Sequence, residues 1–312
     1  MLSRIADSLF WMARYLERTD GILRMLKINF ITSLDQSGQE DFSWYPVLQI
    51  FTDLSKEDAE KFAHDSDAVL RYMIFAKENG NSIRCIVSKA RENARGVQDH
   101  ITKEVWECIN ELHLCLTDKN LEASIEGGEQ IVMLSKLINQ YLLFNGSADV
   151  TMPRELGWDF MNLGKFIERG LLTANILDIK FGNIVFDVDT TGDLLYWRNV
   201  LLSLSGYELY LKRYHGGLFG LNVADMGILN AQFPRSMAYC LFRLDRIIQN
   251  QPADFHEQGE PLKKIIGRMR SKVEYADMQS ISKMGLHQYL TDLKGDLFLF
   301  SNSLGQNYFS YN

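Results

Sequence analysis

A short helical motif occurs twice in this chain, and the repeat is the feature that most restricts how the chain can fold. The first copy, residues 11–18, reads Trp-Met-Ala-Arg-Tyr-Leu-Glu-Arg, and the second, residues 162–169, reads Asn-Leu-Gly-Lys-Phe-Ile-Glu-Arg. Each copy has a basic residue followed by an aromatic one, and each ends in Glu-Arg. Two helices are therefore expected to present a glutamate and an arginine in the same way.

The residues around the two Glu-Arg pairs indicate where the pairs lie. Apolar residues recur every three or four positions, as on the buried stripe of an amphipathic helix. Arg18 falls where this pattern calls for an apolar residue, while Glu17 follows Ala13 and Glu168 follows Gly164 by one helical turn. Small residues let a neighbouring helix approach closely. We therefore predict that both glutamates lie in helix–helix contacts.

Two interpretations of the Glu-Arg pairs remain open at this point. A carboxylate and a guanidinium are costly to bury unless they are paired and hydrogen-bonded. The pairs can therefore be structural, fixing the register in which helices pack. They can also line a pocket for a charged ligand, because perturbed charged groups are common at functional sites.

The hydrophobic pattern predicts an all-α fold. Strand-like alternation is essentially absent, and five prolines in 312 residues favour long helices. We expect one large multi-helix bundle, residues 1–312, with an internal pseudo-repeat whose halves are about 1–147 and 148–312. The first expected helix ends near residue 34. The other long helices are expected to cover 82–116, 121–143, 151–179, 193–214, 231–248, 261–276 and 286–308. The expected breaks are the turn at 35–40, the loop between the halves at 145–149, the glycine-rich stretch 215–227, and 250–252.

Composition excludes several classes of protein. The net charge of −7 argues against a general nucleic-acid binder. No apolar run approaches about 18 residues and the first residues lack an apolar signal core, so we expect a cytoplasmic protein with no membrane segment. The four cysteines form no Cys-x-x-Cys pair and are expected to be reduced. No Glu-x-x-His or His-Glu-x-x-His occurs, so neither a metal nor another cofactor is predicted.

A second group of charged residues lies in the predicted helix 82–116. Arg91 and Arg95 are one turn apart, with Glu92 between them, and can contact one carboxylate or phosphate together. Arg95 can also pair with Asp99 at the same spacing, which requires no ligand. A basic group at residues 263–272 lies on a helix with a regular apolar side, so its charges are expected to face solvent or an anionic partner.

Taken together, these segments resemble the alpha-E family, a helical domain of unknown function with a Glu-Arg motif. The matching segments are residues 2–18, 90–95, 157–169, 233–236 and 285–287, so the resemblance covers nearly the whole chain. It implies two partners, a circularly permuted ATP-grasp ligase and a transglutaminase-like peptidase, encoded beside such proteins or fused to them. The implied setting is peptide synthesis or modification. No reaction is implied for the helical protein itself.

The leading hypothesis is an accessory binding or scaffold subunit of such a system, with a central polar site for a peptide, a carboxylate or the partner enzyme. The residues assigned to this site are Arg18, Arg91, Glu92, Arg95 and Arg169. The alternative is a cofactor-free enzyme in which Glu17 or Glu168 is a general base and arginines stabilise a developing anion. In a third account the charges are purely structural. A homo-oligomer is compatible with all three.

Overall fold

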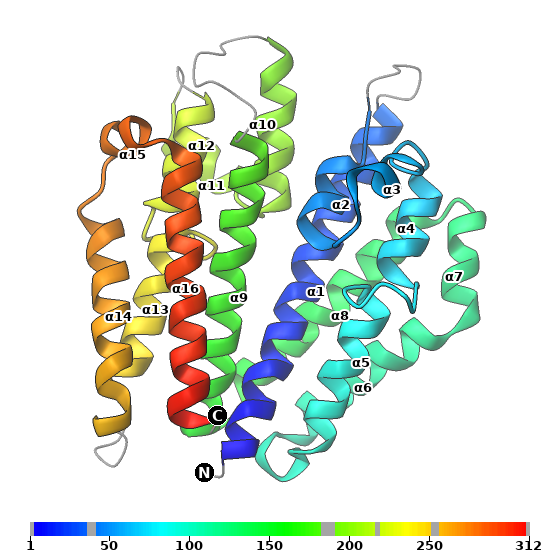
Figure 1. Ribbon diagram of the computed structural model, residues 1–312. Coiled ribbons are helices and arrows are strands. Elements are labelled where there is room, and N and C mark those ends of the chain that lie inside the picture. Colours follow the sequence, from blue (N-terminus) through cyan, green and yellow to red (C-terminus); the bar gives the residue numbers. More distant parts are fainter. Residues whose placement is uncertain (1–2, 36–41, 182–190, 216–218, 251–255, 310–312) are drawn as a thin grey trace. The chain divides into compact units, whose positions relative to one another are not determined.

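The computed structural model is helical throughout its described part. The described residues are 3–35, 42–181, 191–215, 219–250 and 256–309. Over these residues the chain forms helices and no strands, which confirms the all-α prediction (Figure 1). Contacts divide the chain into two compact units: an N-terminal unit, residues 11–158, and a C-terminal unit, residues 1–10 together with 159–312. That the whole chain acts as one domain stays a prediction.

The N-terminal unit is built on most of α1 and on the seven α-helices that follow it. Their bounds are α1 (Ser3–Asp35), α2 (Tyr45–Phe51), α3 (Lys56–Glu60), α4 (Ser66–Ile74), α5 (Ile83–Arg95), α6 (Lys103–Thr117), α7 (Lys119–Glu126) and α8 (Gln130–Thr151), with a 3-10 turn at Gln98–His100. Helix α6 packs against both α5 and α8, and α4 contacts α7. The buried side chains of α5 are apolar at helical spacing, as an amphipathic helix requires.

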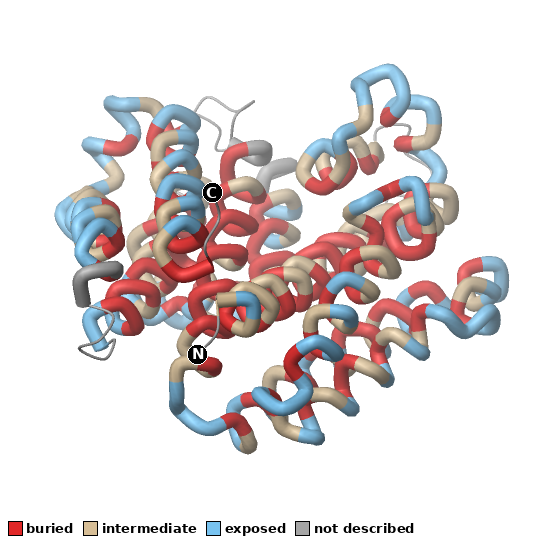
Figure 2. The backbone as a smooth tube through the Cα atoms, turned by 60° about the horizontal axis from the view of Figure 1, so that its bottom comes forward, coloured by how far each residue is buried: buried red, intermediate tan, exposed pale blue. Residues whose placement is uncertain are grey.

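The C-terminal unit repeats this order of long and short helices. Its elements are α9 (Leu156–Phe181), α10 (Thr191–Ser203), α11 (Tyr207–Arg213), α12 (Phe219–Ile228), α13 (Met237–Gln249), α14 (His256–Glu274), α15 (Met278–Met284) and α16 (Leu286–Tyr308). Helix α14 packs against α13 and α16, as α6 does against α5 and α8. Helix α10 contacts α11 and α12, and α15 contacts α16. Figure 2 shows buried and exposed residues following one another around the individual helices.

The prediction of one helix over residues 82–116 is wrong, because the chain breaks between α5 and α6. Gly96 ends α5, and its N–H donates back to the carbonyl of Glu92. Thr102 then caps α6, since its hydroxyl accepts from the N–H of Val105. A glycine and a capping threonine six residues apart therefore outweigh the continuous apolar pattern.

The loop predicted at residues 145–149 is also wrong, because these residues belong to α8. Phe144 and Ala148 are buried and continue the apolar stripe of that helix. The helix ends at Thr151, where Pro153 holds Met152 in an extended conformation. The following helix consequently begins at Leu156 rather than at Thr151.

Two further predictions fail in the C-terminal unit. The stretch 215–227 was expected to be the least helical, yet α12 covers much of it. Gly227 serves close packing, because a Cβ there would lie 2.7 Å from Cδ1 of Leu177. The single helix expected over 193–214 is interrupted near Ser205, whose φ of 56° is left-handed. The turn expected at 36–40 and the break at 251–252 lie outside the described residues.

All four thiols are free, and Cys108 and Cys240 are buried. A search of the described helices finds none with the length and apolar character needed to cross a membrane.

Candidate functional site

The first Glu-Arg pair links α1 to two other helices of the N-terminal unit. Glu17 is 1% exposed, and its carboxylate accepts a hydrogen bond from the phenol of Tyr141 on α8. Arg18 is half-buried, and its Nη1 donates to Oδ1 of Asn81 at 3.1 Å. Asn81 directly precedes Ser82, the N-cap of α5. Adjacent residues of α1 thus contact α8 and the start of α5.

The second pair makes a matching link inside the C-terminal unit. Glu168 on α9 is 3% exposed. Nη1 of Arg169 donates to the carbonyl of Pro234 at 3.2 Å, and its guanidinium lies 5.4 Å from the ring centre of Phe166. Pro234 is two residues before Ser236, the N-cap of α13. Both arginines therefore reach the segment that leads into a 13-residue helix.

The capping serines of α5 and α13 have the same surroundings. Ser82 and Ser236 are fully buried, and each hydroxyl accepts from the backbone N–H three residues later. Each hydroxyl also donates, at 2.6 Å, to the carbonyl six residues earlier, which belongs to Ala76 in one case and to Asn230 in the other. Two separate segments thus form the same kind of local structure, because in each of them a serine both holds the preceding turn and caps the helix.

The aromatic residue of each repeated motif also has a matching partner. Lys89, seven residues after Ser82, places Nζ 5.9 Å from the ring centre of Tyr15. Arg243, seven residues after Ser236, places its guanidinium 4.6 Å from the ring centre of Phe166. Cations over aromatic faces are attracted by the ring quadrupole. In both units this contact joins the helix of the motif to the helix that follows the capping serine.

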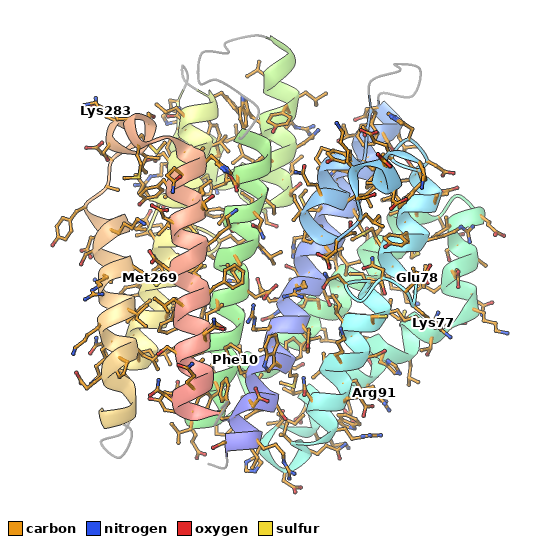
Figure 3. All side chains as sticks on the ribbon, in the orientation of Figure 1. Phe10, Lys77, Glu78, Arg91, Met269 and Lys283 are labelled. Atoms are coloured by element: carbon orange, nitrogen blue, oxygen red, sulfur yellow. The ribbon has the colours of Figure 1, made fainter. Side chains whose placement is uncertain are left out.

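The predicted arginine fork on α5 is assembled around its own glutamate. Arg95 Nη2 lies 2.6 Å from a carboxylate oxygen of Glu92, and Arg91 Nη1 lies 3.6 Å from the other. Arg91, which is labelled in Figure 3, also contacts α6. Its Nε donates to Oδ1 of Asn110 at 2.8 Å, and its guanidinium lies 5.6 Å from the ring centre of Trp106. We call Arg91, Glu92 and Arg95 the arginine cluster. Its ion pairs are exposed, with Glu92 52% and Arg95 62% accessible.

The structure does not bring Arg18 into the arginine cluster. Arg18 contacts Asn81 at the N-terminal end of α5, whereas Arg91 is ten residues further along the chain. At a rise of about 1.5 Å per residue, this separation is about 15 Å along the helix axis. Arg169 belongs to the other unit. The assignment of all five residues to one polar site therefore stays a prediction.

One titratable side chain lies next to the arginine cluster. Nδ1 of His113 on α6 lies 3.5 Å from the hydroxyl of Ser88 on α5. Burial lowers the pKa of His113, and the nearby guanidinium of Arg91 lowers it further. Both effects disfavour the protonated form of the imidazole.

The sequence did not single out an ionic group that joins α9 to α16. Asp178 is buried, and its carboxylate lies 2.5 Å from Nδ1 of His287 and 2.5 Å from Nζ of Lys294. The partners are 109 and 116 residues away in the chain, so no local spacing could have revealed them. The signals were an aspartate within an apolar stripe and a histidine at the start of a predicted helix. Within the described part of the chain, no group of three or more His, Cys, Asp or Glu side chains could hold a metal ion.

Comparison with known proteins gives three distant relatives. They are uncharacterized proteins of Mycobacterium bovis and of two Mycobacterium tuberculosis strains, each 21% identical over 310 residues. The match covers 93% of this chain and 34% of each relative, so the chain spans about a third of the length of the curated relatives it matches. No solved structure gives a significant match.

A family model matches residues 1–309, and its description is a predicted alpha-helical domain with a conserved ER motif. The matched region contains both Glu-Arg pairs, α1 to α16 and the arginine cluster. The helical architecture agrees with that description over all the residues the structure describes. The chain belongs to the Alpha-E family.

Proposed function

We propose that this chain is an accessory binding subunit that recognises a carboxylate through the arginine cluster on α5. One observation carries the proposal: Arg91 and Arg95 already converge on one carboxylate, that of Glu92. Two guanidinium groups on one carboxylate are the arrangement that suits an acidic side chain or a peptide C-terminus. Glu92 then occupies the position that a carboxylate of the bound molecule would take.

The energetics favour exchange at this position. Exposed ion pairs contribute only about 0–1 kcal/mol, so moving Glu92 aside costs little. Arg91 is only 26% exposed and is held by Asn110 and Trp106, which keeps its planar group in place for a ligand. A pre-positioned guanidinium loses less conformational entropy on binding than a free one. Binding a carboxylate at this position therefore requires little free energy to displace Glu92 and little loss of conformational entropy at Arg91.

The buried glutamates support a structural role rather than catalysis. A general base must come within hydrogen-bond reach of the proton that it removes. Glu17 and Glu168 are 1% and 3% exposed, and Glu17 already accepts from Tyr141. We therefore favour a binding subunit over a cofactor-free enzyme that uses these residues.

The partner that we propose is an ATP-grasp-type ligase, with a transglutaminase-like protein in the same peptide-modifying system. The length of the relatives is compatible with a partner joined in the same chain, because the region that matches this chain is about a third of each. A cytoplasmic location fits the four free thiols. We also infer that α1–α8 and α9–α16 are two copies of one helical unit, on the strength of their matching serine, arginine and aromatic contacts.

The test is the affinity of an ATP-grasp ligase from the same organism for this chain, measured with purified proteins. Arg91→Lys and Arg95→Lys keep the charge and remove the two-pronged contact, so each should weaken binding about tenfold, or about 1.4 kcal/mol. Arg154→Lys is the matched control, since Arg154 is also exposed, pairs with Asp149 and lies over Trp158. Full affinity in the cluster variants would exclude the arginine cluster. Failure of the unaltered chain to bind would exclude the ligase.

A further inference from the structure

A pocket of about 460 Å³ opens between α13, α14 and the segment that follows α12. Its walls are mainly apolar, with Leu241 and Phe242 from α13 and Val273 from α14. Phe242 is 43% exposed, so part of the apolar wall faces solvent. The volume is within the range of about 300–1,000 Å³ that is usual for small-molecule sites.

Small side chains account for the empty space. Ala231 and Ala238 line the pocket, and they lie five residues before and two residues after Ser236. The positions with the same spacing from Ser82 in the N-terminal unit carry Lys77 and Arg84. Two long basic side chains in one unit are thus replaced by methyl groups in the other. The substitution removes both volume and positive charge from this side of the helix pair.

The ionic groups at the pocket leave a surplus negative charge. Arg270 lies between two carboxylates, with Nη1 2.6 Å from Oδ2 of Asp245 and Nε 3.3 Å from Oε2 of Glu274. One guanidinium and two carboxylates carry a net charge of −1. Asp245 also accepts from Nε2 of Gln249 at 3.2 Å and does not line the pocket. Arg270 and Glu274 both line the pocket. The shorter contact of Arg270 is with Asp245, and Glu274 is 53% exposed, so the Glu274 carboxylate is the one accessible to a ligand.

We propose that this pocket binds a small primary amine with an aromatic or branched aliphatic body. The apolar body would lie against Leu241, Phe242 and Val273, and the ammonium group would donate to Glu274. A charge-assisted hydrogen bond of this kind is stronger than a neutral one. A carboxylate of the same shape would meet the surplus negative charge and bind more weakly. The site lies in the C-terminal unit and is independent of the arginine cluster on α5.

Three indole compounds of similar shape test the proposal: tryptamine, the alcohol tryptophol and the anion indole-3-propionate. Binding is followed by NMR on protein with carbon-13 in its alanine methyl groups, because Ala231, Ala238 and Ala276 report from the pocket walls. We expect tryptamine to bind at millimolar concentration or tighter and the anion to bind at least tenfold more weakly, with the alcohol between them. No shift of these methyl groups with tryptamine, or equal affinity for amine and anion, would overturn the proposal.

Two variants separate the apolar contact from the ionic one. Ala238→Leu fills the pocket and should abolish binding of all three compounds. Glu274→Gln removes only the charge, so it should weaken tryptamine at least fivefold and leave tryptophol unchanged. Glu260→Gln is the matched control, because Glu260 is an exposed residue of the same helix that pairs with Lys263 outside the pocket. Should Ala238→Leu not fold, the Glu274→Gln result decides alone, and unchanged tryptamine affinity in that variant contradicts the assignment.

Discussion

The two units use the same contacts to fold and different residues on their surfaces. Ser82 and Ser236 cap matching helices, and Arg18 and Arg169 reach the segments that lead into them. The two serines are fully buried, and the two arginines are half-buried. Contacts that recur in both units are explained by the demands of packing, so residues that differ at matching positions are the better candidates for function.

The clearest difference lies nine residues after each capping serine. Arg91 stands there in the N-terminal unit and Asp245 in the C-terminal unit, so the sign of the charge is reversed. Each bonds to the neighbouring long helix, Arg91 to Asn110 and Asp245 to Arg270. The N-terminal unit thus presents an arginine cluster, and the C-terminal unit presents an apolar pocket with Arg270 and Glu274 in its lining.

The largest expected effect is the loss of a buried glutamate. Glu17→Ala removes the partner of the buried Tyr141 phenol, and Glu168→Ala removes an equally buried carboxylate. Each change should lower the free energy of unfolding by about 3 kcal/mol, because it removes a buried, charged hydrogen-bonding group and leaves space in a helix contact. Urea unfolding measures the loss, with the exposed Glu57→Ala as control. A loss below about 1 kcal/mol at either glutamate would show that the two pairs are not equivalent.

The capping serines should be next in size. Ser82→Ala and Ser236→Ala each remove a helix cap and the hydroxyl that donates to the carbonyl six residues earlier, at a cost of about 2 kcal/mol. Matching surroundings predict that the two losses agree closely. Ser55→Ala, on the exposed cap of α3, should cost less in the same unfolding experiment. Unequal losses for Ser82 and Ser236 would show that the two capping serines are not energetically equivalent.

The cation–aromatic contacts should contribute less. Lys89→Met and Arg243→Met keep most of the apolar stem and remove the charge over Tyr15 and Phe166. We expect losses of about 0.5–1 kcal/mol. Arg243→Met should have the larger effect, because Arg243 lies nearer its ring and donates to the Tyr239 hydroxyl at 2.9 Å. The reverse order, measured as a shift in urea midpoint, would mean that these contacts do not govern the packing of the two helices.

The smallest effect should appear at His113, where the units differ. His113 faces Ser88, six residues after Ser82, whereas Arg270 faces Phe242, six residues after Ser236. Because burial and Arg91 hold the pKa of His113 below its usual 6.5, the unfolded chain binds the proton more readily. This contribution to stability is therefore complete above pH 6.5 and is lost as the pH falls through the folded pKa.

The measurement at His113 compares two pH values. Urea midpoints of the unaltered chain and of His113→Gln at pH 7.5 and pH 5.5 give the contribution directly, with the exposed His64→Gln as control. The advantage of the unaltered chain should shrink at the lower pH. An advantage that grows as the pH falls would mean that the imidazole is stabilised in its charged form.

Local sequence predicted what depends on short-range pattern. Apolar periodicity predicted the all-α class, and the repeated motif pointed to Glu17 and Glu168 in helix contacts, where both are buried. The predicted helix boundaries were wrong where a single residue ends the helix, as Gly96 does for α5 and Pro153 does for α8. These residues act through backbone geometry, which an apolar stripe does not record.

Long-range partners could not be predicted from spacing. Tyr141 lies 124 residues from Glu17, and Asn110 lies 19 residues from Arg91 on another helix. The sequence suggested Asp99 as a partner for Arg95, whereas the fold pairs Arg95 with Glu92. The pocket of the C-terminal unit could not be predicted either. It is lined by alanines, and no local pattern in the sequence indicates that these alanines border an empty space.

The central claim is that buried Glu-Arg helices hold the fold while the arginine cluster recognises the partner. Calorimetric titration of the ATP-grasp ligase into Glu17→Gln and Arg95→Lys tests it most directly, because one experiment reports both affinity and the binding-competent fraction. We predict that Glu17→Gln lowers the competent fraction and leaves Kd unchanged, since the cluster is intact in every folded molecule. Arg95→Lys should leave the fraction unchanged and raise Kd about tenfold. A raised Kd for Glu17→Gln together with an unchanged Kd for Arg95→Lys would contradict the account.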